Sequence, residues 1–87
     1  MITQKFLIKN ENGLDVKAIT KIVNVASGFS SNIDFTVNQN TADAKSIINL
    51  MALNVKCNEE LLITIDGKDE NEALKSLIMV FEECQII

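Results

Sequence analysis

The chain has 87 residues, which is enough for one domain with a single hydrophobic core. Hydrophobic residues make up 47% and charged residues 23%, as in an ordinary globular domain. No apolar run is long enough to span a membrane, and the first residues lack the basic and apolar regions of a signal peptide, so we expect a cytosolic protein without membrane insertion. The net charge of -4 argues against nucleic acid as a partner.

The missing residue types exclude several kinds of chemistry. The chain has no histidine, proline, tryptophan or tyrosine, and all of its basic residues are lysines. Without histidine it lacks the usual general base at neutral pH and the histidine-assisted serine and cysteine nucleophiles. Two cysteines, Cys57 and Cys84, are too few for a four-thiolate zinc site, so we expect no metal and no other cofactor. In the cytosol we expect both thiols to be reduced, and Cys84 to be a core residue of the last helix.

The first half of the chain alternates strand and helix patterns. Residues 2–8 alternate imperfectly between apolar and polar positions, which predicts a strand. Residues 16–27 predict a helix that begins after Asp15, a favoured N-cap residue, and stops at Gly28, a residue suited to a left-handed helix end. Residues 33–37 predict a second strand, residues 38–40 a hairpin turn and residues 41–43 a short return strand. The apolar stripe of the helix consists of Val16, Ile19, Ile22, Val23 and Ala26.

The second half continues with two helices and a strand. A short helix starts at Ser46, is apolar on most of its circumference and ends near Asn54, and residues 61–65 are the clearest strand of the chain. Asp69 and Glu72 resemble a capping box at the start of a helix over residues 70–84. The order β-α-β-β-α-β-α predicts an α+β domain with one sheet and its helices on one face.

Three segments together resemble the HPr family, the phosphocarriers of the bacterial sugar phosphotransferase system. They are residues 12–20 (NGLDVKAIT), 45–53 (KSIINLMAL) and 62–73 (LITIDGKDENEA). The resemblance covers essentially the whole chain, so residues 1–87 are expected to be a single HPr-like domain. It implies an open-faced β-sandwich, in which a four-stranded sheet carries three helices on one face.

The first of these segments departs from the family's pattern. The resemblance places Asp15 where the family has its phosphoacceptor histidine, and Lys17 where an arginine steadies the phosphoryl group. A carboxylate acceptor forms an acyl phosphate, which usually needs a metal ion, and lysine lacks the planar fork of arginine. The resemblance therefore implies a degenerate phosphoacceptor site without catalytic residues. Three roles remain open for Asp15: a helix cap, an imitation of the phosphorylated state, or an unusual acceptor.

The second segment keeps the family's regulatory pattern. Ser46 matches the serine that HPr kinase/phosphorylase phosphorylates in relatives, although an ordinary N-cap is the simpler interpretation. A helix of two turns cannot bury every apolar side, so part of it should form an exposed docking surface. The expected partner-binding residues are Lys17, Thr20, Lys21, Lys45, Ile47, Ile48, Met51 and Leu53.

The sequence thus predicts a histidine-less HPr-like protein, similar to the catabolite-repression HPr-like proteins, that binds partners and is not an enzyme. Phosphorylation of Ser46 would control the binding. The resemblance implies HPr kinase/phosphorylase and a catabolite-control transcription regulator as partners, with Enzyme I as a further candidate. Two alternatives stay open: a phosphocarrier that uses Asp15 as acceptor, and a small-ligand or oligomerisation module built on the same fold.

Overall fold

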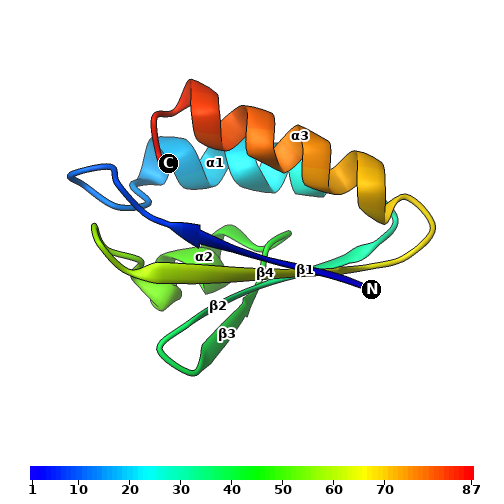
Figure 1. Ribbon diagram of the computed structural model, residues 1–87, viewed down its shortest axis with the longest axis horizontal. Helices are drawn as coiled ribbons and strands as arrows, with labels where there is room; N and C mark the ends of the chain where they lie inside the picture. The colour runs from blue at the N-terminus through cyan, green and yellow to red at the C-terminus, as the bar shows by residue number, and fades with distance from the viewer.

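A computed structural model describes residues 1–87. The chain forms four strands and three helices in the predicted order (Figure 1). The strands make one antiparallel sheet in the order β1-β4-β2-β3. The elements are β1 (Ile2–Leu7), α1 (Val16–Ala26), β2 (Asn32–Val37), β3 (Asn40–Asp43), α2 (Ile47–Leu53), β4 (Glu60–Asp66) and α3 (Glu70–Glu83).

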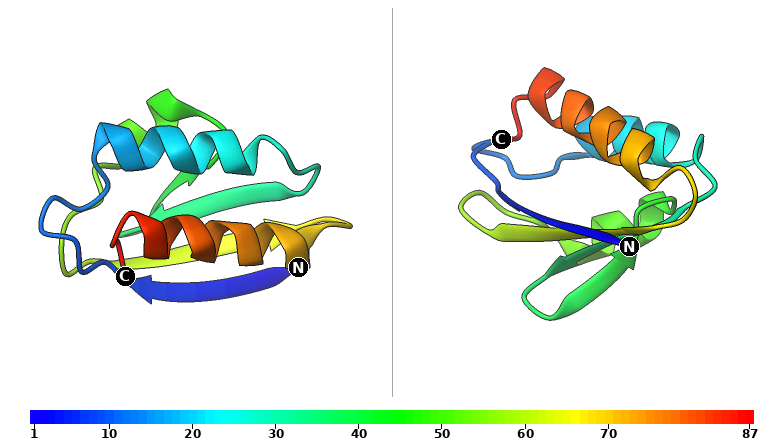
Figure 2. Two further views of the ribbon diagram at one scale, coloured as in Figure 1. Left: turned by 90° about the horizontal axis from the view of Figure 1, so that it is seen from above. Right: turned by 45° about the vertical axis from the view of Figure 1, so that its right-hand side comes forward.

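The helices cover one face of the sheet and leave the other open. The two long helices, α1 and α3, lie side by side over the sheet, and the short α2 contacts α1 and the edge strand β3 (Figure 2). This arrangement is the expected open-faced sandwich. None of the three helices is both long and apolar enough to cross a lipid bilayer.

The core lies between the sheet and the helices. Alternate residues of β2 and β4 face the helices and are at most 3% exposed: Ile33, Phe35, Val37, Leu61, Ile63 and Ile65. They meet the buried side of α1 and α3, where the ring of Phe81 packs edge-on against Phe6 and Phe35 at centroid distances of 5.3 and 6.0 Å. These aromatic and branched side chains form a single apolar cluster across the domain.

The short hairpin predicted at residues 38–40 is confirmed. Asn38 and Gln39 both have positive φ, 51° and 71°, so the turn between β2 and β3 has two central residues with left-handed backbone. That geometry matches the twist of an antiparallel pair and sets the register of β3.

Helix α1 differs from the prediction at each of its two ends. Val16, the first residue of the helix, is 58% exposed and does not belong to the buried stripe. Gly28 does not adopt a left-handed backbone. The helix instead ends at Ser27 in right-handed geometry, with its amide donating to Val23 O.

The predicted capping box at α3 is wrong. Asp69 makes no cap hydrogen bond to the first turn of α3. Its carboxylate instead accepts hydrogen bonds from Ser30 and Ser31, which follow α1. Glu70 accepts from Gly67 N at 3.2 Å, so the local carboxylate that closes this turn is one residue further along the chain.

Candidate functional site

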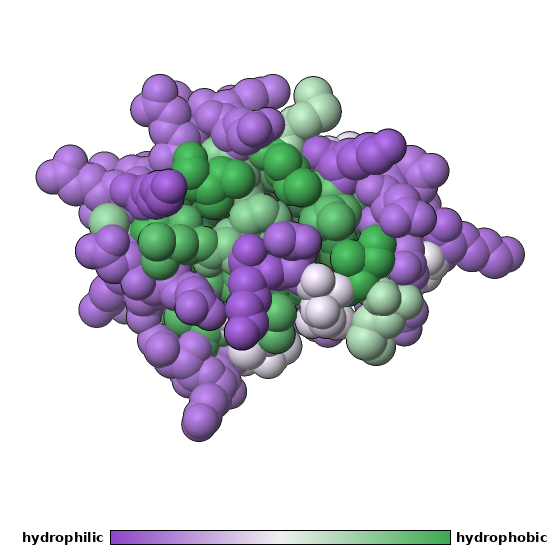
Figure 3. All heavy atoms as spheres, viewed as in Figure 1, coloured by the Kyte–Doolittle hydropathy of each residue, from purple (hydrophilic) through white to green (hydrophobic).

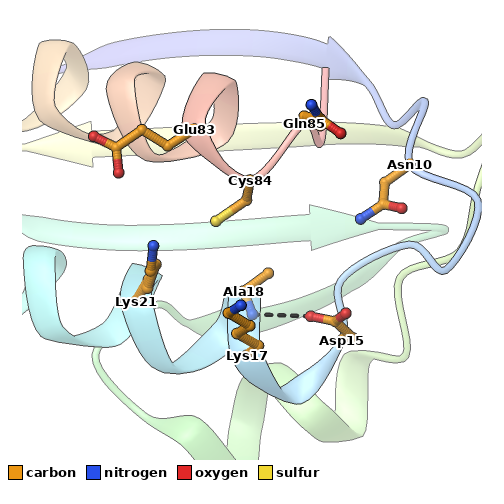
Figure 4. A pocket seen from close by; sticks show the side chains of 8 residues that line it. All are labelled: Asn10, Asp15, Lys17, Ala18, Lys21, Glu83, Cys84 and Gln85. Carbon is orange, nitrogen blue, oxygen red and sulfur yellow. Dashed lines mark hydrogen bonds between the residues drawn. The ribbon is translucent and has the colours of Figure 1, made fainter.

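A polar cavity of about 210 Å³ lies between the N-terminal end of α1 and the C-terminal end of α3 (Figure 4). It brings together three residues that the sequence singled out, Asp15, Lys17 and Lys21. The full lining is Asn10, Asp15, Lys17, Ala18, Lys21, Glu83, Cys84 and Gln85. The two residues of the predicted degenerate phosphoacceptor site, Asp15 and Lys17, therefore line a surface cavity whose walls carry both charge signs.

A tight turn positions Asp15 at this cavity. Gly13 has φ +63°, and a Cβ atom at Gly13 would lie 2.1 Å from Val55 O. Leu14 N donates to the same carbonyl at 3.1 Å, which holds the loop before α1 against the segment that follows α2. Only glycine fits this combination of close approach and left-handed backbone.

Asp15 caps α1, as predicted. Its backbone is extended, and Oδ1 accepts from Ala18 N at 2.9 Å (Figure 4). The side chain is exposed, and Oδ2 has no hydrogen-bond partner within the chain. A carboxylate here also interacts favourably with the positive end of the helix dipole. The cap thus explains the residue type without any further role.

Two lysines, and no cluster of metal ligands, line the cavity beside Asp15. Lys17 and Lys21 are exposed, lie four residues apart on α1 and form no salt bridge with a carboxylate. No three histidine, cysteine, aspartate or glutamate side chains cluster as metal ligands anywhere in the chain. The two lysine ammonium groups can attract an anion to the cavity, but neither can hold a phosphoryl group bidentately as arginine does.

We expect Asp15→Ala to lower the free energy of unfolding by about 1 kcal/mol, because an N-cap hydrogen bond is lost. Asp15→Asn should be nearly neutral, since asparagine caps as well as aspartate does. Urea unfolding of the two variants measures both effects. A loss of partner binding in Asp15→Asn without a loss of stability would show that the negative charge itself matters.

Four cavity residues could not be found from the sequence. Asn10 lies in the loop after β1, and Glu83, Cys84 and Gln85 come from the end of α3, so the cavity joins the two ends of the chain. Cys84 is half-buried and not fully in the core, and Figure 4 shows its thiol directed toward the space between α1 and α3. Both cysteines are free thiols, as expected.

The second candidate surface is on α2. Leu50 is the only buried residue of this helix. We call Ile47, Ile48 and Met51 the α2 patch; they are 40%, 79% and 48% exposed. Leu53 is half-buried beside them. The expected exposed apolar surface is thus present in the structure.

Ser46 lies at the start of this patch. Its Oγ accepts from Asn49 N at 3.3 Å, which is long for a cap hydrogen bond, and the residue is half-exposed. The backbone of Ser46 is extended, as is usual for an N-cap residue, and its side chain lies at the first turn of α2.

Two of the expected partner-binding residues, Lys45 and Thr20, donate hydrogen bonds to backbone carbonyls within the chain. The Lys45 ammonium donates to Phe29 O at 2.7 Å, just beyond the end of α1. The hydroxyl of Thr20 donates to Val16 O at 2.8 Å. Lys17 and Lys21 have no such bond, whereas the Lys45 bond joins the residue two positions before α2 to the segment that follows α1.

A family model described as "PTS HPr component phosphorylation site" matches residues 2–83. The chain belongs to the HPr family. The resemblance found in the three segments is therefore confirmed, and this HPr-family chain differs from a histidine-containing carrier in having no histidine at all.

Individual relatives agree with this assignment. The phosphocarrier protein HPr of Xylella fastidiosa strain 9a5c is 32% identical over 82 residues, covering 94% of this chain and 92% of the relative. Among solved structures, a histidine-containing phosphocarrier protein of Mycoplasma matches with a TM-score of 0.96 at 29% identity, covering 99% of this chain and 98% of the other. The catabolite repression protein Crh of Bacillus subtilis matches with a TM-score of 0.74 at 31% identity, covering 95% of each chain.

Proposed function

We propose that this HPr-family chain is a regulatory binding protein of carbon catabolite control, switched by phosphorylation of Ser46, and does not carry phosphoryl groups to sugars. The observation that supports it is an exposed α2 patch directly after Ser46 in a chain without histidine. The proposed partners are HPr kinase/phosphorylase and a catabolite-control transcription regulator. Incorporation of phosphate at Ser46 by that kinase and ATP tests the proposal, with Ser46→Ala as the control.

The α2 patch supplies the binding energy in this account. Three apolar side chains on one two-turn helix stay in water although the core below them is filled. Fully burying an isoleucine side chain contributes roughly 1.5–3 kcal/mol. Burial of Ile48 in an apolar groove of a partner would therefore contribute a large part of the binding free energy. Clustered exposed apolar residues of this kind are typical of protein-binding surfaces.

Phosphorylation of Ser46 would add an anion at the edge of the patch. The phosphate carries a charge of about -1.5 to -2 at neutral pH, and its oxygens can accept from Asn49 N in place of Oγ. Asp43 lies nearby, since Ser46 N donates to Asp43 O at 3.1 Å, and its carboxylate accepts from Lys45 N at 3.0 Å. Because the Lys45 ammonium is engaged at Phe29 O, the chain offers the phosphate little positive charge of its own.

The cation that pairs with the phosphate should therefore come from the partner. A partner with a plain apolar groove must desolvate the new charge and binds more weakly. A partner with arginine beside its groove gains charge-assisted hydrogen bonds and binds more tightly. The proposed switch is thus a change of partner preference on one surface, and the fold stays as it is.

A phosphocarrier that uses Asp15 is the second candidate function. The observation in its favour is the exposed carboxylate with a free Oδ2 atom, in a cavity that also presents Lys17 and Lys21. To form an aspartyl phosphate, the anionic carboxylate must attack an anionic phosphoryl group, and the residues around Asp15 hold no metal-ligand cluster to offset the charge of these two anions.

We expect no stable phosphoryl transfer to this chain from Enzyme I and phosphoenolpyruvate. The physical reason is the loss of an imidazole acceptor, and intact-mass analysis after the reaction measures it, with a histidine-containing HPr as the positive control. A stoichiometric, hydroxylamine-labile adduct that disappears in Asp15→Asn would favour the second candidate over the first.

A further inference from the structure

Lys45 differs from the other lysines of the chain. Seven of the eight lysines are exposed, and Lys45 alone is half-buried. Figure 3 shows how hydrophilic side chains project from the surface on one face of the molecule. The Lys45 ammonium instead donates to Phe29 O at 2.7 Å, and no other lysine ammonium donates a hydrogen bond within the chain. Because fixing a lysine side chain costs conformational entropy, a bond that holds one in place indicates a structural role.

The carbonyl that Lys45 contacts lies just beyond the C-terminal end of α1. The amides of Gly28 and Phe29 donate back to carbonyls of the helix, so the chain leaves α1 in tight turns. No backbone amide donates to Phe29 O. The ammonium therefore supplies the partner of this carbonyl, at the helix end where a cation is favoured by the helix dipole.

The same peptide group is held from its other side. Its N–H belongs to Ser30 and donates to Asp69 Oδ2 at 2.9 Å. An ammonium at the oxygen and a carboxylate at the N–H polarise the peptide group in the same direction, so each hydrogen bond strengthens the other. Asp69 lies directly before α3, and Lys45 lies one residue before the N-cap of α2. One peptide group after α1 thus joins the starts of the other two helices.

The start of α2 has few other attachments. The helix has seven residues, of which only Leu50 is buried, and a helix this short is not stable by itself. The amides of Lys45 and Ser46 donate only to Asp43, two and three residues earlier, and Ala44 N donates to a carbonyl of β2. No hydrogen bond other than that of the Lys45 ammonium links residues 43–46 with residues 27–31.

We propose that Lys45 is a positioning residue for Ser46. Its bond to Phe29 O fixes the start of α2 against the end of α1, and Asp69 fixes the same peptide group in turn. The inference rests on the proposed function, because the position of Ser46 matters for transfer only if Ser46 accepts a phosphoryl group. It gives Lys45 a role within the chain, whereas a partner-binding residue would act by touching the kinase.

The transfer itself explains why position matters. The bond between Ser46 Oγ and the γ-phosphorus of ATP forms as the bond from that phosphorus to its bridging oxygen breaks. ADP leaves, and the hydroxyl proton passes to a base of the kinase. The attacking and leaving oxygens must lie roughly in line, so a helix start that moves spends less time in the reactive geometry.

Amide hydrogen exchange tests the positioning without a kinase. Leu50 N donates to Ser46 O at 3.1 Å, so its exchange rate reports opening of the first turn of α2. We expect Lys45→Met to raise that rate at least fivefold. Lys45→Arg, which keeps a donor for Phe29 O, and Lys75→Met, at an exposed lysine of α3, should each change it less than twofold. An unchanged rate in Lys45→Met, or equal rates in Lys45→Met and Lys45→Arg, would overturn the proposal.

The kinetics of phosphorylation test the consequence for Ser46. With the HPr kinase/phosphorylase of the proposed function, Lys45→Met should lower kcat about tenfold and leave KM unchanged, because the α2 patch still docks and only the acceptor moves. Asp69→Asn should lower kcat in the same direction, although Asp69 makes no hydrogen bond to α2, and Glu72→Gln should not.

The other outcomes separate the two proposals. A higher KM with an unchanged kcat in Lys45→Met would show direct contact between Lys45 and the kinase, and a normal kcat in Asp69→Asn would remove Asp69 from the account. Either result overturns the proposed positioning. If the kinase did not phosphorylate the native chain at all, the proposed function would be contradicted. The exchange rate of Leu50 would then still decide whether Lys45 holds the start of α2.

Discussion

Asp69→Asn is expected to lower the melting temperature more than either substitution at Asp15. The Asp69 carboxylate accepts from Ser30 N at 2.9 Å, Ser30 Oγ at 3.3 Å and Ser31 N at 3.0 Å, and it also accepts from the Ser31 hydroxyl. The asparagine side chain keeps one acceptor oxygen, but its NH2 group replaces the other. That NH2 group cannot accept a hydrogen bond from the amides and hydroxyls of Ser30 and Ser31. Thermal unfolding at neutral pH measures the loss. Glu72→Gln is the matched control, since Glu72 is an exposed carboxylate on the same helix without these bonds.

The same cluster predicts a pH dependence. The Ser31 hydroxyl first, and then the Ser30 amide, lower the pKa of Asp69 to about 2 from an ordinary value of 3.8. Because the folded state holds this proton less tightly than the unfolded state does, the stabilisation is complete above about pH 4 and is lost as the pH falls toward 2. The difference in stability between the native chain and Asp69→Asn should therefore shrink over that range. A difference that stays constant from neutral pH to about pH 2 would contradict the assignment.

Ile48→Asp is expected to weaken partner binding at least tenfold and leave the fold intact. Ile48 is the most exposed residue of the α2 patch, at 79%, so its side chain contributes little to the core and is available for a contact. Truncating a central apolar residue of an interface commonly costs more than 1 kcal/mol, and an added carboxylate must also be desolvated. Titration of HPr kinase/phosphorylase or the catabolite-control regulator measures the loss.

Met79→Asp is the control for this substitution. Met79 is also apolar and exposed, at 60%, but it lies on α3 outside the α2 patch. It should not change the affinity of those partners. If both variants bound equally weakly, or if neither bound more weakly than the native chain, the α2 patch would not be the docking surface.

The parts of the structure that depend on local chemistry could be predicted. Asp15 and Ser46 stand directly before their helices because the side-chain oxygens reach an amide three residues along the chain. The alternating segments became strands because one face of the sheet is buried. The α2 patch followed from the number of apolar residues on a helix too short to bury them.

The contacts that the sequence did not indicate join distant segments. Asp69 was expected to cap its own helix, and its partners Ser30 and Ser31 are 39 and 38 residues away. Lys45 was expected to face a partner, but its ammonium reaches Phe29, 16 residues earlier. The cavity at Asp15 depends on the end of α3, which no local pattern relates to the start of α1. Such pairings are decided by the packing of the helices on the sheet, so residue spacing carries no signal for them.

The most direct test of the account is the affinity of one partner for the chain before and after phosphorylation of Ser46. HPr kinase/phosphorylase and ATP should add a single phosphoryl group, located at Ser46 by peptide mapping and absent in Ser46→Ala. The phosphorylated chain should keep its melting temperature, because the change lies at a half-exposed residue at the start of a helix, outside the core. Its affinity for the catabolite-control regulator should change tenfold or more. No incorporation at Ser46, or equal affinities of both forms for every partner that binds, would contradict a switch at this residue.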